Sequence, residues 1–165
     1  YNVVISDIAM TKAQRQSVDF TVPVYTDRQV LVSCDSAVTS PLGLAGKKVW
    51  APSGSPAVER LENLEREIGD TILIEDSHSY TSEQLCLLVA KGEIERAVVN
   101  EAVARHMAQD YPDLCISTGI SLNQFQAWAV AKNNPRLLER LNNEIESFKT
   151  TAAYKALCEK WLDKE

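Results

Sequence analysis

The chain has 165 residues and a formal charge of −6, with 45% hydrophobic and 24% charged residues. These proportions are typical of a folded globular domain rather than of a disordered segment. The longest uncharged apolar run, Leu85 to Ala90, is much shorter than the roughly 20 residues that a membrane-spanning helix needs. Acidic residues outnumber basic residues by 23 to 17, so no basic surface is expected that would neutralise nucleic-acid phosphates. Composition thus argues against a membrane span and a nucleic-acid-binding module.

The first part of the chain is predicted to form short strands and turns. Pro23 prevents a helix around it and favours extended backbone in its neighbour. Thr11 is placed to cap a short helical turn. In chain order, strands are expected at residues 1–7, 18–25 and 28–34, a helical turn at 9–16 and a surface connection at 36–46.

From residue 47 onward, strands are predicted to alternate with helices. Ser55 as N-cap and Pro56 at the first helical position begin one helix, which Gly69 ends. The run Thr81-Ser82-Glu83-Gln84 fits a capping box that begins the next. Such alternation is typical of an α/β fold with a parallel sheet covered on both faces. The expected strands are 47–51, 71–74, 96–99, 114–117 and 125–131, and the expected helices are 55–68, 81–91, 101–109, 134–148 and 150–161.

The cysteines and histidines do not suggest a metal site. The four cysteines are widely spaced, with no CxxC pair and no Cys/His cluster, so neither a metal nor another cofactor is predicted. Four cysteines allow three complete pairings, and the sequence does not choose among them. His78 and His106 stand in polar stretches and are predicted to be solvated. The cysteines are Cys34, Cys86, Cys115 and Cys158.

Six motifs stand in an order that resembles the family-3 bacterial extracellular solute-binding proteins. They lie at residues 3–11, 18–25, 44–55, 91–99, 128–135 and 154–161, so the resemblance covers nearly the whole chain. Residues 28–32, 54–61, 68–71 and 82–85 resemble in particular the binding-protein-like domain of membrane-bound lytic murein transglycosylase F and its relatives. In those proteins such a domain precedes a catalytic domain that cleaves peptidoglycan. The motifs GxSxG, HExxH and GxGxxG and the P-loop are absent here, and no catalytic residue is predicted.

The resemblance implies a type 2 periplasmic-binding-protein fold, in which two lobes are joined by two crossing strands. Residues 1–35 and 124–165 would then form part of lobe 1, and residues 36–123 would form lobe 2. The family's first lobe begins with strands and helices that have no counterpart here, about two βαβ units of roughly 30 residues each. Lobe 1 is therefore expected to be truncated at the N-terminus. Tyr1 is expected to be an interior position of a longer exported protein.

The resemblance also places a ligand in the cleft between the lobes, which close over it by a hinge. One part of this site follows from the residues alone. The turn at Ser53, Gly54 and Ser55 leads into a helix N-terminus, whose backbone N–H groups and positive dipole end suit a carboxylate or phosphate. The alternative is that Gly54 is only a turn residue and Ser55 only a cap. By resemblance, the cleft also includes Asp7, Thr11 and Tyr25.

Two positions depart from the amino-acid-binding members that this chain resembles. Those members carry an arginine three residues after the threonine, where this chain has Gln14 followed by Arg15. A shift of one residue along a helical turn rotates a side chain by about 100°. They also carry an acid for the ligand ammonium where this chain has Asn100. A desolvated charged headgroup needs a counter-charge, so a peptide or muropeptide fits Gln14 and Asn100 better than a free α-amino acid does.

The leading hypothesis is a periplasmic or otherwise extracytoplasmic protein, membrane-anchored or not, that is not an enzyme. It would capture a small amino-acid-like, peptide or muropeptide ligand for an ABC permease. The alternative is a ligand-sensing regulatory module associated with a peptidoglycan lytic transglycosylase. A third class, the effector domain of a transcription regulator, requires a basic helix-turn-helix upstream. Discovery of a downstream catalytic domain would favour the second hypothesis, and a neighbouring permease gene would favour the first.

Overall fold

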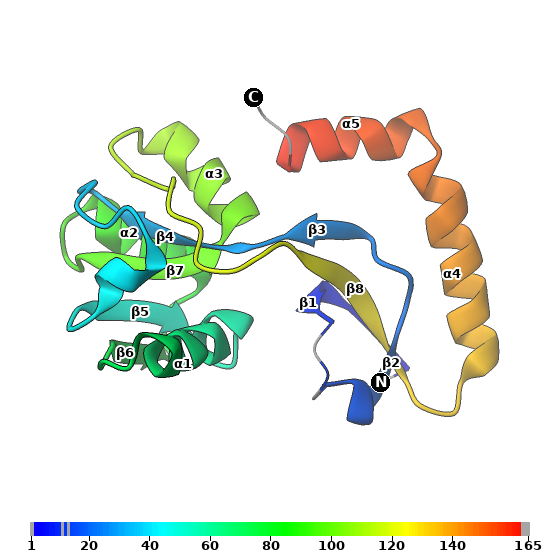
Figure 1. Cartoon of the computed structure of the whole chain (residues 1–165). Coiled ribbons are helices and arrows are strands. Elements are labelled where there is room, and N and C mark those ends of the chain that lie inside the picture. Colours follow the sequence, from blue (N-terminus) through cyan, green and yellow to red (C-terminus); the bar gives the residue numbers. More distant parts are fainter. Residues whose placement is uncertain (1, 11, 13, 163–165) are drawn as a thin grey trace. The chain divides into compact units, whose positions relative to one another are not determined.

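The computed structural model describes residues 2–10, 12 and 14–162. The chain divides into two compact units. Unit 1 is Tyr1–Asp27 with Gln124–Glu165, and unit 2 is Arg28–Asn123. The chain passes from one to the other twice, after Asp27 and after Asn123 (Figure 1).

Unit 1 contains a sheet organised around one long strand. β8 (Gln124–Ala131) pairs antiparallel with β1 (Val3–Ala9), β2 (Val18–Phe20) and β3 (Tyr25–Asp27). A short 3₁₀ helix, η1 (Gln14–Gln16), lies between β1 and β2.

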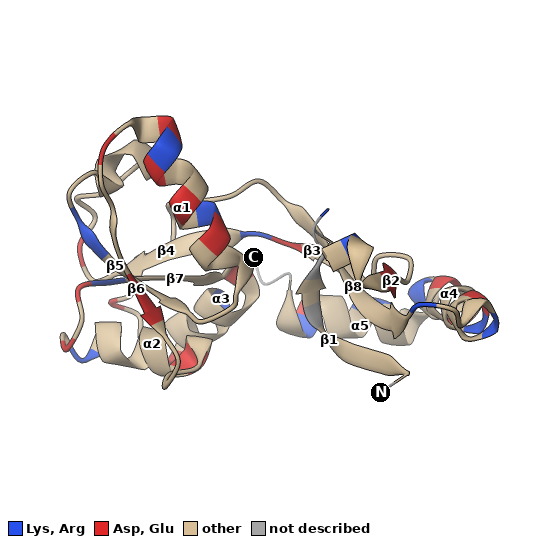
Figure 2. Ribbon diagram, turned by 90° about the horizontal axis from the view of Figure 1, so that it is seen from below, with Lys and Arg blue, Asp and Glu red and all other residues tan. Residues whose placement is uncertain are grey.

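Two helices complete this unit, α4 (Pro135–Lys149) and α5 (Ala152–Trp161). The side chains of Asn134 and Thr151 cap them by accepting from the N–H groups of Leu137 and Tyr154. Acidic and basic residues both occur along α4, as expected for a helix with a solvated face (Figure 2).

Unit 2 is built on a mixed sheet in the order β4-β7-β5-β6. β5 (Lys48–Pro52), β6 (Leu73–Ser77) and β7 (Arg96–Asn100) are parallel, whereas β4 (Gln29–Ser33) runs antiparallel to β7. The remaining elements are η2 (Pro41–Leu44), α1 (Pro56–Ile68), α2 (Ser82–Ala90) and α3 (Glu101–Asp110).

Helices lie on both sides of this sheet (Figure 1), and an apolar cluster packs on each of its faces. Leu61 and Leu64 of α1 belong to one cluster, while Leu85 and Val89 of α2 belong to the other. Successive residues of β4 and β7 alternate between the two clusters, as the two-residue period of a strand requires. This burial on both faces explains why β4 and β7 are continuous apolar runs in the sequence.

The predicted helix boundaries of unit 2 are largely confirmed. α1 begins after Ser55 and ends at Gly69, which adopts a left-handed φ of 72°. At α2, Thr81 and Gln84 form the predicted capping box, because each side chain binds the backbone N–H of the other. No helix among the described residues is long and apolar enough to cross a membrane.

Two expectations about the strands of unit 2 differ from the structure. Residues 114–117 do not form a strand, since Cys115 makes only an isolated bridge to Ser33. The unit 2 sheet is not wholly parallel, because β4 pairs antiparallel with β7. Five residue pairs join β4 to β7, and unit 2 begins at Arg28. The assignment of residues 1–35 and 124–165 to lobe 1 and of residues 36–123 to lobe 2 stays a prediction.

Candidate functional site

The loops after three parallel strands meet at one edge of the unit 2 sheet. β5, β6 and β7 run in the same direction, so their carboxyl ends share that edge, and β4 begins there because it is antiparallel. In open α/β sheets, ligands bind outside the carboxyl ends of the strands. We call this edge the carboxyl edge of unit 2. It comprises Arg28, Gln29, Ser53, Gly54, Ser55, Ser77, His78, Asn100 and Glu101.

The β5–α1 loop has two features that suit contact with a ligand. Gly54 has a φ of 67°, and a Cβ added there would meet no atom within 4 Å, so the backbone is open on that side. Ser55 is the N-cap of α1, yet its side chain makes no capping hydrogen bond. Its Oγ is buried and has no hydrogen-bond partner among the described residues. A buried unpaired hydroxyl is costly, and a ligand atom could satisfy it.

Backbone groups at the start of α1 are less available than the sequence suggested. Pro56 has no N–H, and the N–H of Ser55 donates to Pro52 O at 3.2 Å. The N–H of Val58 donates to Ser55 O, also at 3.2 Å. The positive end of the helix dipole remains, but the side-chain hydroxyl of Ser55 is the better-placed polar group.

Ser53 joins the β5 and β6 loops. Its N–H donates to Ser77 O at 2.8 Å, and its Oγ lies 3.2 Å from Nε2 of His78. Nδ1 of His78 lies 3.4 Å from Asp76 O. The turn that carries His78 is held by Ser77, whose Oγ accepts from the N–H of Tyr80 at 3.1 Å. His78 is solvent-exposed as predicted, but it contacts the candidate site.

Asn100 ends β7 and begins α3 as its N-cap, without a side-chain capping bond. Its Oδ1 accepts a hydrogen bond from Nε2 of Gln29 at 3.2 Å. Gln29 is fully buried at the start of β4. The side-chain oxygen of Asn100 therefore already accepts one hydrogen bond from within unit 2.

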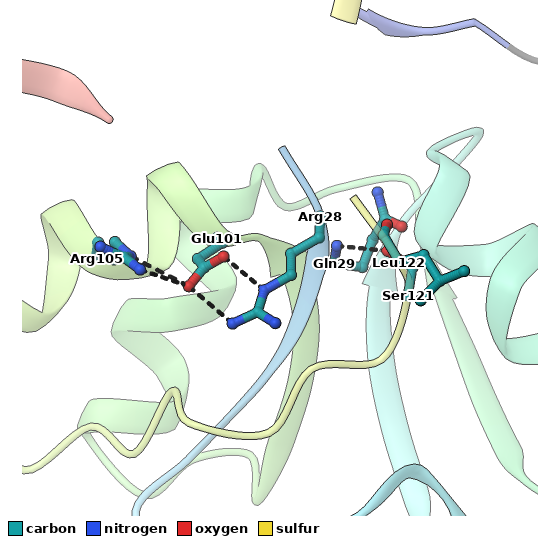
Figure 3. Close-up of polar contacts among 6 residues, drawn as sticks. All are labelled: Arg28, Gln29, Glu101, Arg105, Ser121 and Leu122. Carbon is teal, nitrogen blue, oxygen red and sulfur yellow. Dashed lines mark hydrogen bonds and ion pairs between the residues drawn. The ribbon is translucent and has the colours of Figure 1, made fainter. Parts of the chain in front are cut away.

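The carboxylate next to Asn100 is bound by two arginines (Figure 3). Nε of Arg28 donates to Glu101 at 2.6 Å and its Nη2 donates at 3.2 Å, while Arg105 binds the same carboxylate at 2.9 and 3.2 Å. Hydrogen bonds from Arg28 and then Arg105 lower the pKa of Glu101, although burial opposes them. Glu101 is consequently ionised and already paired.

Gln29 also ties together the two ends of unit 2 (Figure 3). Its N–H donates to Oγ of Ser121 at 2.9 Å. Its carbonyl oxygen accepts from the N–H groups of Ile120 and Ser121 at 2.8 and 3.3 Å. Gln29 and Ser121, which lie close to the two ends of unit 2, are thus hydrogen-bonded to each other.

The remaining predicted site residues lie in unit 1. Asp7 belongs to β1, and Thr11 lies outside the described residues. Gln14 and Arg15 are exposed on η1. Tyr25 begins β3 and lines a cavity of about 270 Å³ within this unit. The cavity is lined by Pro23, Tyr25, Thr26, Phe125, Lys149, Tyr154, Cys158 and Leu162.

Arg28, Gln29 and His78 are parts of the carboxyl edge that were not proposed from the sequence. Arg28 and Glu101 are 73 positions apart, so no local motif links them. His78 was predicted to be only solvated, because it has no metal or acid–base spacing. Within the described ranges, no group of three or more His, Cys, Asp and Glu side chains could hold a metal ion.

The sequence model of the bacterial extracellular solute-binding proteins, family 3, matches residues 1–164. The chain belongs to this family. It has the type 2 periplasmic-binding-protein fold. An ancestral arginine-binding protein bound to arginine superposes with a TM-score of 0.81 at 25% identity, over 98% of this chain and 72% of that chain.

Two kinds of family 3 relative are similar in sequence. Membrane-bound lytic murein transglycosylase F of Desulfosudis oleivorans is 29% identical over 153 residues, which cover 92% of this chain and 34% of that protein. ABC transporter arginine-binding protein 1 of Escherichia coli is 25% identical over 168 residues, covering 98% of this chain and 66% of that protein. The chain thus spans about a third of the first relative and just under two thirds of the second.

Proposed function

We propose that this family 3 domain is an extracytoplasmic module that captures a small polar solute and passes it to an ABC permease. The observation that carries this proposal is the buried, unpartnered Oγ of Ser55 beside the open left-handed backbone of Gly54. Both residues lie at the sheet edge where α/β proteins bind ligands. The E. coli relative, an ABC transporter arginine-binding protein, supports a transport role.

The ligand is proposed to be a peptide or muropeptide rather than a free α-amino acid. Gln14 and Asn100 are neutral amides, which suit hydrogen bonds to amide groups. Glu101 is a poor substitute for a missing acid, because Arg28 and Arg105 already bind its carboxylate. A ligand ammonium beside Asn100 would have to compete with two guanidinium groups for the Glu101 carboxylate. Asp7, Thr11, Arg15, Tyr25 and Ser53 remain proposed contacts.

Binding should be measured directly on the whole chain. Thermal-shift and calorimetric titrations would compare L-arginine, L-glutamine, tri-L-alanine and soluble muropeptides. The expected result is that a peptide or muropeptide raises the melting temperature and binds with measurable heat. Tight binding of one free amino acid, with no response to peptides, would contradict the proposed ligand class. A radius of gyration that shrinks on ligand addition in small-angle scattering would support lobe closure.

A second candidate function is a sensing module that regulates a lytic transglycosylase. The specific observation in its favour is the 29% identity to membrane-bound lytic murein transglycosylase F, above the 25% to the arginine-binding protein. The parent gene separates the two candidates. A catalytic transglycosylase domain in the same reading frame would favour sensing, and adjacent permease genes would favour transport. Cell fractionation of the full-length product would test the proposed periplasmic or membrane-anchored location.

A further inference from the structure

The pair formed by Ser53 and His78 defines a hydrogen-bond direction at the carboxyl edge of unit 2. The oxygen of Asp76 is a backbone carbonyl, so it can only accept a hydrogen bond. Nδ1 of His78 faces it at 3.4 Å, a long contact that favours a proton on Nδ1. In a neutral imidazole the other nitrogen, Nε2, is then an acceptor. Ser53 Oγ lies 3.2 Å from Nε2 and is the group that can donate to it.

We propose that His78 is a positioning residue that turns the Ser53 hydroxyl into an acceptor for a donor group of the ligand. This inference rests on the proposed function and goes beyond it, because it names the chemistry recognised at one point of the site. With the Ser53 proton directed to His78, the lone pairs of Oγ are left for a ligand N–H or O–H. A carboxylate oxygen of the ligand would instead be repelled there.

The surrounding backbone keeps this arrangement in place. The N–H of Ser53 is bound to Ser77 O at 2.8 Å, which fixes the β5 loop against the end of β6. His78 directly follows Ser77, whose hydroxyl accepts from Tyr80 N–H. Gly54 and Ser55 come next in the same loop, so the Ser53 oxygen lies within two residues of the unpartnered Ser55 hydroxyl. Amide N–H groups of a peptide and hydroxyl groups of a sugar both supply the required donor.

The tautomer of His78 can be tested without any ligand. The chain has two histidines, so histidine-labelled protein gives one signal set for His78 and one for His106. At about pH 8.5, where imidazole is normally neutral, nitrogen chemical shifts should show the proton of His78 on Nδ1. Ser53→Ala should shift the His78 signals and leave those of His106 unchanged. A proton on Nε2, or His78 signals that ignore Ser53→Ala, would overturn the inference whatever the protein binds.

The binding test uses tri-L-alanine as the amide donor and N-acetylglucosamine as the hydroxyl donor. Ser53→Ala and His78→Ala should each lower the affinity for the probe by about three- to tenfold, which corresponds to the loss of one hydrogen bond. The double variant should lose no more than either single variant, and His106→Ala should stay within about twofold. Additive losses, or unchanged affinity, would overturn the positioning role. If neither probe binds the unmodified chain, the proposed ligand class fails, while the tautomer measurement still decides the role of His78.

Discussion

Arg28 and Glu101 are 73 positions apart in the sequence, and Nε of Arg28 lies 2.6 Å from Oε2 of Glu101. The N–H of Glu101 also donates to Arg28 O at 2.8 Å, so the first residue of α3 is held to the start of β4 through both backbone and side chain. The resulting ion pair stands beside Asn100 at the carboxyl edge. This ion pair engages the carboxylate of Glu101, which directly follows Asn100 in the sequence.

This relationship predicts a pH-dependent stabilisation. The pKa of Glu101 is lowered from its ordinary 4.5, chiefly by Arg28, so its contribution is complete above that value and is lost as pH falls through the lowered pKa. Glu101→Gln should lower the free energy of unfolding by about 1–2 kcal/mol at neutral pH. Urea titrations should show this gap closing in acid. Glu67→Gln is the control, because Glu67 pairs with Arg60 on the surface and should matter much less. A gap that is independent of pH would contradict the prediction.

Two helix N-caps should respond differently to truncation. The Thr81 side chain accepts from Gln84 N–H, so Thr81→Ala should cost about 1 kcal/mol. Ser55 makes no such bond and its hydroxyl is buried without a partner, so Ser55→Ala should not lower the free energy of unfolding. Ligand affinity should show the reverse order, with a loss only for Ser55→Ala. Equal stability losses at both caps would show that Ser55 caps α1 in solution.

Gly54 and Gly46 form a matched pair for testing the site. Their φ angles are 67° and 68°, and a Cβ at either position would meet no atom within 4 Å. Gly54→Ala and Gly46→Ala should therefore destabilise the protein by a similar amount, about 1 kcal/mol. Only Gly54→Ala should weaken ligand binding in calorimetry, because its Cβ would enter the open side of the loop. Equal effects on affinity would argue against contact at Gly54.

Burial should protect one of the cysteines from alkylation. Cys86 is fully buried, and burial raises the pKa of its thiol to about 12, with a smaller contribution from Glu83. Native protein treated with iodoacetamide at about pH 8 should be modified at the exposed Cys34 and spared at Cys86. Both should react in urea, as peptide mass spectrometry would show. Comparable native labelling of Cys34 and Cys86 would contradict the packing of α2 against the sheet.

Features set by a few neighbouring residues could be predicted from the sequence. The capping box at Thr81 and the glycine end of α1 at Gly69 depend on local backbone chemistry, and both are found. Residues 114–117 have the composition of a strand, but pairing depends on distant partners, and only one isolated bridge forms there, between Cys115 and Ser33. The hydrogen bond between Gln29 and Asn100 could not be predicted for the same reason, since 71 positions separate them. The fold could therefore be predicted from the sequence more fully than the contacts of the candidate-site residues.

The hydrogen bond between Gln29 and Ser121 has a consequence for the order of folding. The two residues are 92 positions apart, and their hydrogen bond holds the two ends of unit 2 together. Unit 2 is thus an insertion between the two segments of unit 1. Before unit 2 folds, pairing β3 with β8 requires closure of a long, flexible loop. Once unit 2 has folded, the same pairing spans only a short tether, which reduces the entropic cost by about 3 kcal/mol. We therefore expect unit 2, which is one continuous segment, to fold before unit 1, which is made of two segments.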